Sequence, residues 1–157
     1  MALIKSISGI RGTIGGKTNE NLTPLDVVKF TAAFGTRLLQ QSDNNKIVVG
    51  RDGRISGAIV KSLVISTLNS LGFDVIDMDY STTPTVEMAV KLKKAAGGII
   101  LTASHNPKEW NALKLLNSKG EFINGEEGAM VLEIAEKEEF DFVTVDKLGT
   151  TLRDDKL

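Results

Sequence analysis

The sequence predicts an α/β fold with a sheet that is at least partly parallel. Short apolar segments with strand character alternate along the chain with longer segments whose apolar residues recur every three or four positions. Such alternation is typical of strand–helix–strand units, in which neighbouring strands run parallel. The 157 residues, 41% of them hydrophobic and 25% charged, are enough for one soluble domain with a core.

Five predicted strands account for the short apolar segments. They cover, in chain order, residues 2–8, 46–50, 73–78, 98–102 and 112–116. The second of them, KIVVG, follows a polar connection, as expected of a short buried strand. Residues 9–21 are rich in glycine, threonine and asparagine and are therefore predicted to form a loop. Residues 140–145 alternate apolar and polar side chains.

Two of the four predicted helices begin at a Thr-Pro pair. At Thr23-Pro24 and at Thr83-Pro84 the threonine can cap the helix, and proline suits the first turn because its missing N–H would be unpaired there anyway. The first of these helices has an apolar face that consists of Val27, Phe30, Phe34 and Leu38. We expect this face to pack on the sheet.

The other two helices are predicted from their ends and their periodicity. One begins at Ser56 or Gly57 and stops at Gly72, a residue type that often terminates helices. Its apolar face is expected to comprise Ile59, Leu63 and Leu68, with Val60, Val64 and Leu71 beside them. The last helix covers residues 124–137, with Asn124 placed to cap it and Glu127 three residues later.

The composition excludes several classes of function. The formal net charge is −1, so no bulk attraction to nucleic acid or to an anionic membrane is expected. The absence of cysteine excludes disulfides, cysteine-ligated zinc and a catalytic thiol. The stretch MALIKSISGIRG lacks the long apolar region of a signal peptide, and every apolar run is too short to span a bilayer. We therefore expect a soluble cytoplasmic protein.

Three unusual motifs follow predicted strands: GIRG at 9–12, GRDGR at 50–54 and TASHNP at 102–107. If these strands run parallel, the motifs meet at one edge of the sheet, where ligands bind in open α/β folds. Neither a Walker phosphate loop nor a G-x-G-x-x-G turn between a strand and a helix is present in the sequence. The motifs therefore predict a site of another kind at this edge.

The TASHNP motif contains Ser104 and the only histidine of the chain, His105. Its small residues let a ligand approach the backbone, and Asn106-Pro107 fixes a turn. On chemistry alone, Ser104 is a nucleophile, a phosphoryl carrier or merely a turn residue. A serine hydrolase is disfavoured because adjacent side chains usually point apart and the G-x-S-x-G elbow is absent from the sequence. Metal binding by His105 is disfavoured because no cysteine or second histidine can join it.

Positive charge comes from two further places. In GIRG, Gly9 and Gly12 are expected to let the backbone turn sharply and present Arg11, whose guanidinium can grip phosphate. Lys114 lies ten residues after Ser104 on the apolar stretch ALKLL, where burying a lysine is costly unless an anion receives it. The competing interpretation is an exposed side chain in a loop for Arg11 and on an edge strand for Lys114.

In GRDGR, Asp52 stands between Arg51 and Arg54. A structural role, in which Asp52 pairs with an arginine or with N–H groups of the loop, is favoured over direct contact with a substrate. This motif is therefore expected to support the site structurally, without contacting the substrate.

The motifs occur in a particular order and spacing. TASHNP follows a predicted strand, with Asn111 seven residues and Lys114 ten residues after the serine. GIRG and GRDGR precede it, and STTPT stands at 81–85. This set resembles the first domain of the α-D-phosphohexomutases, the family of phosphoglucomutase, phosphomannomutase and phosphoglucosamine mutase. The resemblance covers essentially the whole chain but only one of the family's four domains.

The resemblance implies a three-layer α/β fold with a mixed, partly parallel sheet and helices on both faces. It assigns residues 1–150 to the first domain, and 151–157 to the start of an inter-domain connection or to an artificial tail. The sequence lacks the family's loops for metal, sugar selection and C-terminal phosphate binding, which lie in domains II to IV, so we expect the isolated chain to be inactive. Ala112 replaces a family glycine, which implies a different turn toward Lys114.

By resemblance, Ser104 is the residue that carries the phosphoryl group. It would pass this group to a sugar phosphate and regain one from the bisphosphorylated intermediate. His105 and Lys114 would flank the group, and Arg11 would bind it. Binding of substrate or phosphate is expected from Thr102, Asn106 and Asn111. Structural support is expected from Gly9, Gly12, Arg51, Asp52 and Arg54.

The resemblance also implies cofactors and partners. Mg²⁺ would bind the phosphate on Ser104 and three aspartates of the second domain, and an activator of the glucose 1,6-bisphosphate type would phosphorylate the serine. The expected partners are a phosphosugar and the remaining domains of the same polypeptide, without nucleic acid or membrane. The sugar, whether glucose or mannose or glucosamine, stays open. The alternative is a stand-alone phosphosugar- or phosphate-binding module without catalysis.

Overall fold

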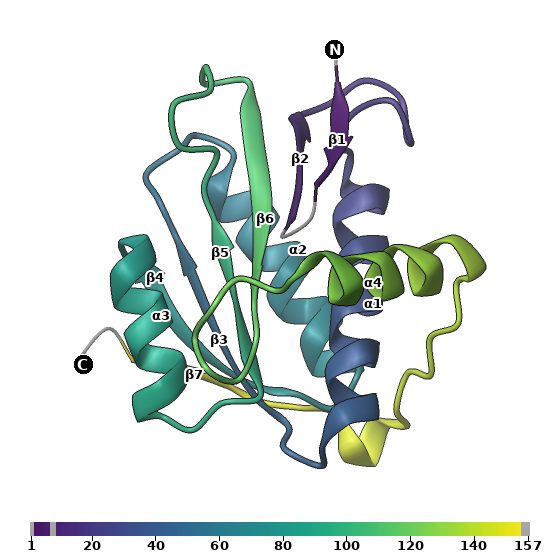
Figure 1. Ribbon diagram of the computed structural model, residues 1–157, viewed down its shortest axis with the longest axis vertical. Helices are drawn as coiled ribbons and strands as arrows, with labels where there is room; N and C mark the ends of the chain where they lie inside the picture. Colours follow the sequence, from purple (N-terminus) through teal and green to yellow (C-terminus); the bar gives the residue numbers. More distant parts are fainter. Residues whose placement is uncertain (1, 7–8, 155–157) are drawn as a thin grey trace.

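The computed structural model describes residues 2–6 and 9–154, which form a seven-stranded sheet (Figure 1). The strands are β1 (Leu3–Lys5), β2 (Gly9–Thr13), β3 (Lys46–Arg51), β4 (Asp74–Tyr80), β5 (Gly97–Leu101), β6 (Trp110–Leu116) and β7 (Thr151–Arg153). Their order across the sheet is β1-β2-β6-β5-β3-β4-β7. Strands β5, β3, β4 and β7 run parallel, whereas β1, β2 and β6 pair antiparallel with their neighbours. The predicted mixed sheet is confirmed.

Helices cover both faces of this sheet. The described helices are α1 (Pro24–Gln41), α2 (Gly57–Ser70), α3 (Thr83–Leu92) and α4 (Gly125–Lys137). Ile47 and Val49 of β3 are buried in one core cluster with residues of α1, α2 and α4, whereas Val48 between them is buried with residues of α3. Successive strand residues point to opposite faces, so these clusters lie on the two sides of the sheet. The predicted three-layer α/β fold is therefore confirmed.

Helix starts follow the capping residues of the sequence, with one shift. The carboxylate of Asp26 accepts the backbone N–H of Thr23 at 3.0 Å, and Asn124 Oδ1 accepts that of Glu127 at 2.9 Å. At α3 the cap is Thr82, whose hydroxyl accepts from Thr85 N, and not Thr83 as predicted. Proline therefore occupies the second helical position there, where its missing N–H is still harmless.

The buried face of α2 differs from the predicted one. Val60, Val64 and Leu68 are buried as expected, but Ile59 is 65% exposed. These three buried residues recur every four positions, and each residue turns a helix by about 100°. Ile59 is therefore rotated away from the sheet, so the prediction that it lies on the core face is wrong.

The GIRG motif lies in a strand and not in the predicted loop. Gly9–Thr13 forms β2, which pairs with β6 on one side and with β1 on the other. Ile10 anchors this strand because its side chain is 2% exposed within the core. Of the predicted strand at residues 2–8, the structure places Leu3–Lys5 in β1, and residues 7–8 lie outside the described part.

The C-terminal segment joins the sheet. Thr151–Arg153 forms β7, which pairs in parallel with β4 through Val75 to Asp77. The alternating stretch 140–145 forms no strand in the described structure, and a 3₁₀ turn follows at Val145–Lys147. Residues 155–157 of the predicted connection lie outside the described part.

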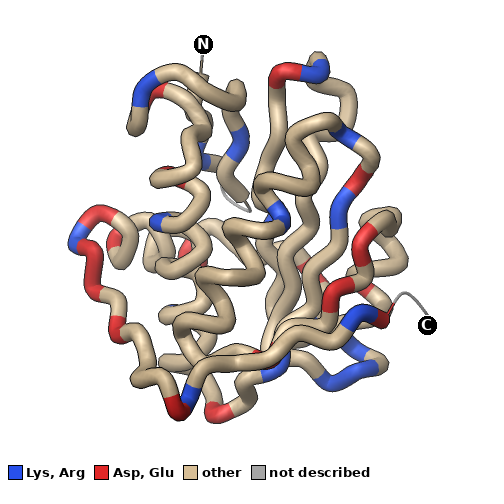
Figure 2. Tube along the Cα trace, turned by 180° about the vertical axis from the view of Figure 1, so that it is seen from behind, with Lys and Arg blue, Asp and Glu red and all other residues tan. Residues whose placement is uncertain are grey.

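Charged residues of both signs are distributed along the trace (Figure 2), in keeping with the net charge near zero. Among the helices that the structure describes, none combines the length and the apolar character needed to cross a membrane.

Candidate active site

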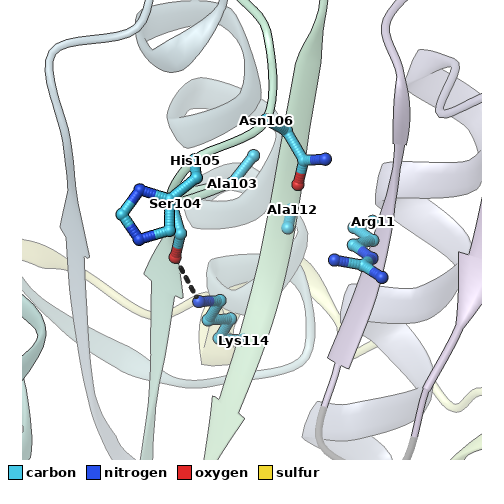
Figure 3. A pocket seen from close by; sticks show the side chains of 7 residues that line it. All are labelled: Arg11, Ala103, Ser104, His105, Asn106, Ala112 and Lys114. Carbon is cyan, nitrogen blue, oxygen red and sulfur yellow. Dashed lines mark hydrogen bonds between the residues drawn. The ribbon is translucent and has the colours of Figure 1, made fainter.

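A pocket of about 240 Å³ lies where the loop after β5 meets β6 and β2 (Figure 3). It is lined by Arg11, Ala103, Ser104, His105, Asn106, Ala112 and Lys114. The fold thus brings together the four residues expected to be catalytic, although they are up to 103 positions apart in the sequence. Two of the motifs, TASHNP and GIRG, contribute to it directly.

Ser104 occupies an unusual backbone conformation in this pocket. Its φ angle is 51°, in the left-handed region that residues other than glycine rarely adopt. The turn is closed by two hydrogen bonds, from Ser104 N to Thr102 Oγ1 at 3.2 Å and from Asn106 N to Ala103 O at 3.0 Å. Lys114 Nζ donates to Ser104 Oγ at 2.9 Å, as the dashed line in Figure 3 shows. The exposed hydroxyl therefore faces a cation, and no base is needed to explain its orientation.

Lys114 and Arg11 bring two positive charges to the same face of the sheet. Arg11 on β2 is paired with Ala112 on β6, and Lys114 is the next residue of β6 on that face. Such diagonal neighbours have backbones about 7–8 Å apart, within reach of long side chains. None of the seven described residues that line the pocket is acidic. Two cations without a carboxylate between them favour an anionic ligand.

Gly9 and Gly12 support Arg11 differently from the way the sequence predicted. Both lie in a regular strand, and they allow other backbone segments to approach closely. A side chain at Gly9 would collide with the carbonyl oxygen of Leu113, and one at Gly12 with that of Ala2. The prediction of a sharp turn around Arg11 is therefore wrong. Arg11 reaches the pocket from a regular strand, β2, which pairs with β6.

Ala112 fits this geometry without strain. It lies inside β6, pairs with Arg11 and is 2% exposed. Left-handed backbone, which glycine would favour, is found instead at Ser104. No turn occurs at Ala112 in the described structure, because Ala112 and Lys114 belong to the same regular strand.

The remaining predicted contact residues divide into two groups. His105 is exposed and lines the pocket together with Asn106. Thr102 and Asn111 are not among the described residues that line it. Asn111 is fully buried, and its side chain donates to Ser56 Oγ at 2.9 Å and accepts from Ala112 N at 2.8 Å. The structure therefore places Thr102 and Asn111 where they shape the backbone around the pocket.

The GRDGR motif contacts the serine loop, which we define as residues 102–109 between β5 and β6. Arg54 donates to backbone carbonyls of that loop, including Ser104 O at 2.9 Å. Asp52 accepts from Arg54, both from its backbone N–H at 3.1 Å and from Nε at 3.3 Å. This motif and TASHNP meet because β3 and β5 are adjacent parallel strands, whose carboxyl ends lie at one edge.

Arg51 belongs to a charged network that the sequence analysis missed. Asp79 accepts from Arg51 Nε at 2.8 Å and from Lys61 Nζ at 2.8 Å, and it forms an ion pair with Arg153 at 3.2 Å. Hydrogen bonds from Lys61 and then Arg51 lower the pKa of Asp79 to about 2, against the opposing effect of burial. The signal in the sequence was DMDY at the end of a strand, where acidic residues interrupt an apolar segment.

The described residues do not form a metal site by themselves. Across residues 2–6 and 9–154, no group of three or more histidine or acidic side chains is placed to hold a metal ion. Of the Mg²⁺ ligands that the resemblance implies, this chain supplies only the phosphate on Ser104.

Comparison with known proteins agrees with this geometry. Residues 3–142 match the family described as "Phosphoglucomutase/phosphomannomutase, alpha/beta/alpha domain I". The phosphoglucomutase/phosphomannomutase of Thermococcus kodakarensis is 40% identical over 92% of this chain, and the phosphoglucosamine mutase of Helicobacter pylori strain G27 is 37% identical over 83%. These matches cover 32% and 28% of the two relatives, so the chain spans about a third of their length.

The fold has a solved counterpart. A phosphoglucomutase/phosphomannomutase family protein of Burkholderia thailandensis superposes with a TM-score of 0.83 over 97% of this chain and 33% of its own, at 24% sequence identity. This likeness shows the fold alone, whereas the sequence match contains all the residues that line the pocket. The chain belongs to the phosphoglucomutase/phosphomannomutase family, as its α/β/α domain I.

Proposed function

We propose that this chain is the phosphoserine-bearing domain of a phosphohexomutase and that Ser104 carries the phosphoryl group. The observation that supports this most is the contact between Lys114 Nζ and Ser104 Oγ in a pocket that also receives Arg11. Phosphoserine has nearly two negative charges and accepts several strong hydrogen bonds. Two cations and a left-handed turn that exposes Oγ suit such a group.

The proposed reaction moves one phosphoryl group at a time. The bond between phosphorus and Ser104 Oγ breaks while a bond from phosphorus to a sugar hydroxyl forms. The hydroxyl loses its proton, and the released Oγ takes one up, so the serine is regenerated. In the second half Ser104 Oγ accepts the other phosphoryl group of the bisphosphorylated sugar. The net result interconverts a sugar 1-phosphate and a sugar 6-phosphate.

The residues of the pocket have separate parts in this scheme. Lys114 donates to Oγ and stabilises the negative charge that develops there as the bond breaks, and Arg11 binds the oxygens of the phosphoryl group. His105 and Asn106 lie beside the group and can donate to it. Bound Mg²⁺ would neutralise further charge, and its other ligands would come from another part of a longer protein. An activator of the glucose 1,6-bisphosphate type would load the serine initially.

The whole protein's activity rests on more than this domain. Since the chain spans about a third of its relatives, we infer that a glucose, mannose or glucosamine phosphate is bound jointly with further domains. On this basis the isolated chain is inactive. The cytoplasmic location expected from the sequence stays a prediction.

The test is intact-mass analysis of the protein encoded by the complete reading frame, after incubation with glucose 1,6-bisphosphate and Mg²⁺. We expect one added phosphate that maps to Ser104, and loss of both phosphate and turnover in Ser104→Ala. An unphosphorylated Ser104, together with full turnover in Ser104→Ala, would contradict the proposal. Binding of a phosphosugar without turnover would favour the non-catalytic module instead.

A further inference from the structure

We propose that Arg54 is the positioning residue of Ser104, and that it acts by clamping the backbone of the serine loop without touching the substrate. This inference builds on the proposed function of Ser104. Its structural part concerns the loop alone and can be tested without a reaction.

The guanidinium of Arg54 has every one of its donors engaged. Nη2 donates to Ser104 O at 2.9 Å and to Asn106 O at 2.8 Å. Nη1 donates to Pro107 O at 2.7 Å and to Trp110 O at 3.1 Å. Nε donates to Asp52 Oδ2 at 3.3 Å. Arginine has five N–H donors in a fixed planar fork, so none is left for a phosphate or a sugar.

The serine loop needs such a clamp because its other hydrogen bonds are few and mostly local. Between β5 and β6 it forms no helix or strand, and internal turns are closed by single bonds such as that from Trp110 N to Pro107 O at 3.0 Å. Ser104 also adopts a left-handed conformation that costs free energy and persists only when its surroundings impose it. Four carbonyls that converge on one guanidinium provide this constraint.

The clamp is itself fixed to the sheet. Asp52 Oδ1 accepts the backbone N–H of Arg54 at 3.1 Å, and Asp52 N donates to Leu101 O at 3.0 Å. The Arg54 side chain is only 12% exposed. The ends of β3 and β5 and the loop between β5 and β6 thus form one connected unit, in which the position of Ser104 Oγ depends on Arg54.

Lysine cannot replace arginine here. Its ammonium has three donors on a flexible stem and lacks the fork that reaches four carbonyls at once. Arg54→Lys therefore keeps the positive charge but cannot form the four hydrogen bonds to the loop carbonyls at once. Arg37 provides a matched control, because its guanidinium also forms a two-pronged contact, with Glu127 at 2.8 and 2.9 Å, but between α1 and α4.

The first experiment measures amide hydrogen exchange by NMR in this chain. In Arg54→Lys we expect the amides of Asn106 and Trp110 to exchange about tenfold faster or more, while amides of β3 and β5 keep their rates. Asp52→Asn, which replaces one of the two acceptor oxygens by an N–H donor, should accelerate the same two amides less. In Arg37→Lys they should be unchanged. Unchanged loop exchange in Arg54→Lys, or acceleration that is equal throughout the sheet, overturns the proposal.

The second experiment measures kinetics in the protein from the complete reading frame. A positioning role predicts that Arg54→Lys lowers kcat by about 10- to 100-fold with KM within about twofold of the original. Added guanidinium ion should restore part of the kcat lost in Arg54→Ala but not that lost in Lys114→Met. A raised KM with unchanged kcat would mean that Arg54 binds substrate and overturns the inference. If Ser104→Ala stays fully active, the proposed function is wrong. The hydrogen-exchange experiment still tests whether Arg54 holds the serine loop.

Discussion

At the scale of single residues, Ser104 combines an exposed hydroxyl with a backbone conformation that disfavours a side chain. Its φ of 51° suits glycine, and its Oγ contacts Lys114. A residue with a Cβ in this region costs about 1–2 kcal/mol relative to a right-handed conformation. This strain is imposed by the loop, and its position at the pocket agrees with the tendency of strained residues to occur at functional sites.

The strain can be measured by comparing two substitutions at this position. We expect Ser104→Gly to be more stable than Ser104→Ala by about 1 kcal/mol, because only glycine adopts this φ without penalty. Urea unfolding of both variants gives the difference. The same pair at Ser118, an exposed residue without positive φ, should show no such preference for glycine. Equal stabilities of the two Ser104 variants would mean that the left-handed turn is not strained.

Lys114 is the residue whose removal should affect chemistry most directly. In Lys114→Met the ammonium that contacts Ser104 Oγ is lost, while the apolar stem on β6 keeps its length. A donor aimed at a reacting oxygen is worth about 10²–10³ in kcat, so we expect a loss of that size. Steady-state kinetics of the protein from the complete reading frame measure it, with Lys119→Met, an exposed lysine outside the pocket, as the control. A loss of less than about threefold would exclude Lys114 from this role.

At the scale of elements, the sequence predicted best what local patterns decide. Caps such as Asn124 and buried repeats such as that of Val60 and Val64 depend on neighbours within one helix, so helix positions were nearly right. Strand β2 was missed because GIRG has the composition of a loop and becomes a strand by pairing with β6. Contacts that join distant segments, such as Arg54 with the serine loop, leave no periodic signal in the sequence.

The site followed the same division. TASHNP and GIRG indicated Ser104 and Arg11, because small residues, an Asn-Pro turn and an arginine can be recognised directly in the sequence. The direction of the Lys114 side chain depends on β6 continuing as a regular strand through Ala112. Only the strand register in the structure shows that it does. The partners of Asp79 could not be predicted from DMDY alone, because they lie on three other elements, namely β3, α2 and β7.

Asp79 should be an important stabilising residue, because its ion pairs join β4 to β3, α2 and β7. Asp79→Asn removes the charge but keeps a residue type that tolerates the observed φ of 53°. Arg51 then loses its carboxylate partner, and Lys61 keeps only Asp77. Breaking a buried ion pair from one side costs about 3–5 kcal/mol, which is the loss we expect at pH 7. Urea unfolding measures it. In Glu133→Gln, which removes an exposed pair with Lys137, stability should be unchanged.

The pH dependence of this effect has a definite sign. The pKa of Asp79 is lowered in the folded state from 3.8 to about 2, so its contribution is complete above the unfolded-state pKa. It is lost as the pH falls through the window from about 4 to 2. The stability difference between the original chain and Asp79→Asn should thus be constant from pH 7 to 5 and smaller at pH 3. A difference that does not change with pH would mean that the pKa of Asp79 is not lowered.

At the scale of the whole molecule, the described residues form a buried core and an open pocket. The two buried clusters lie on the two faces of the sheet, and β7 pairs at its edge, so the described residues bury a hydrophobic core of their own. The pocket, in contrast, offers cations and a serine but no group of three metal ligands among the described residues. We therefore expect a separation between folding and catalysis, in which this chain folds by itself but does not catalyse the reaction.

This separation gives the last prediction. The chain of 157 residues should fold cooperatively by itself but should not interconvert glucose 1-phosphate and glucose 6-phosphate, even with Mg²⁺ and glucose 1,6-bisphosphate. The physical reason is that phosphoryl transfer requires a site that excludes water and compensates the charges of the phosphates. An open pocket of about 240 Å³ cannot enclose both ends of a bisphosphorylated sugar. A coupled assay for glucose 6-phosphate measures turnover, circular dichroism verifies the fold, and the Thermococcus kodakarensis relative serves as a positive control. Turnover by the folded chain that disappears in Ser104→Ala would show that this domain alone completes the active site.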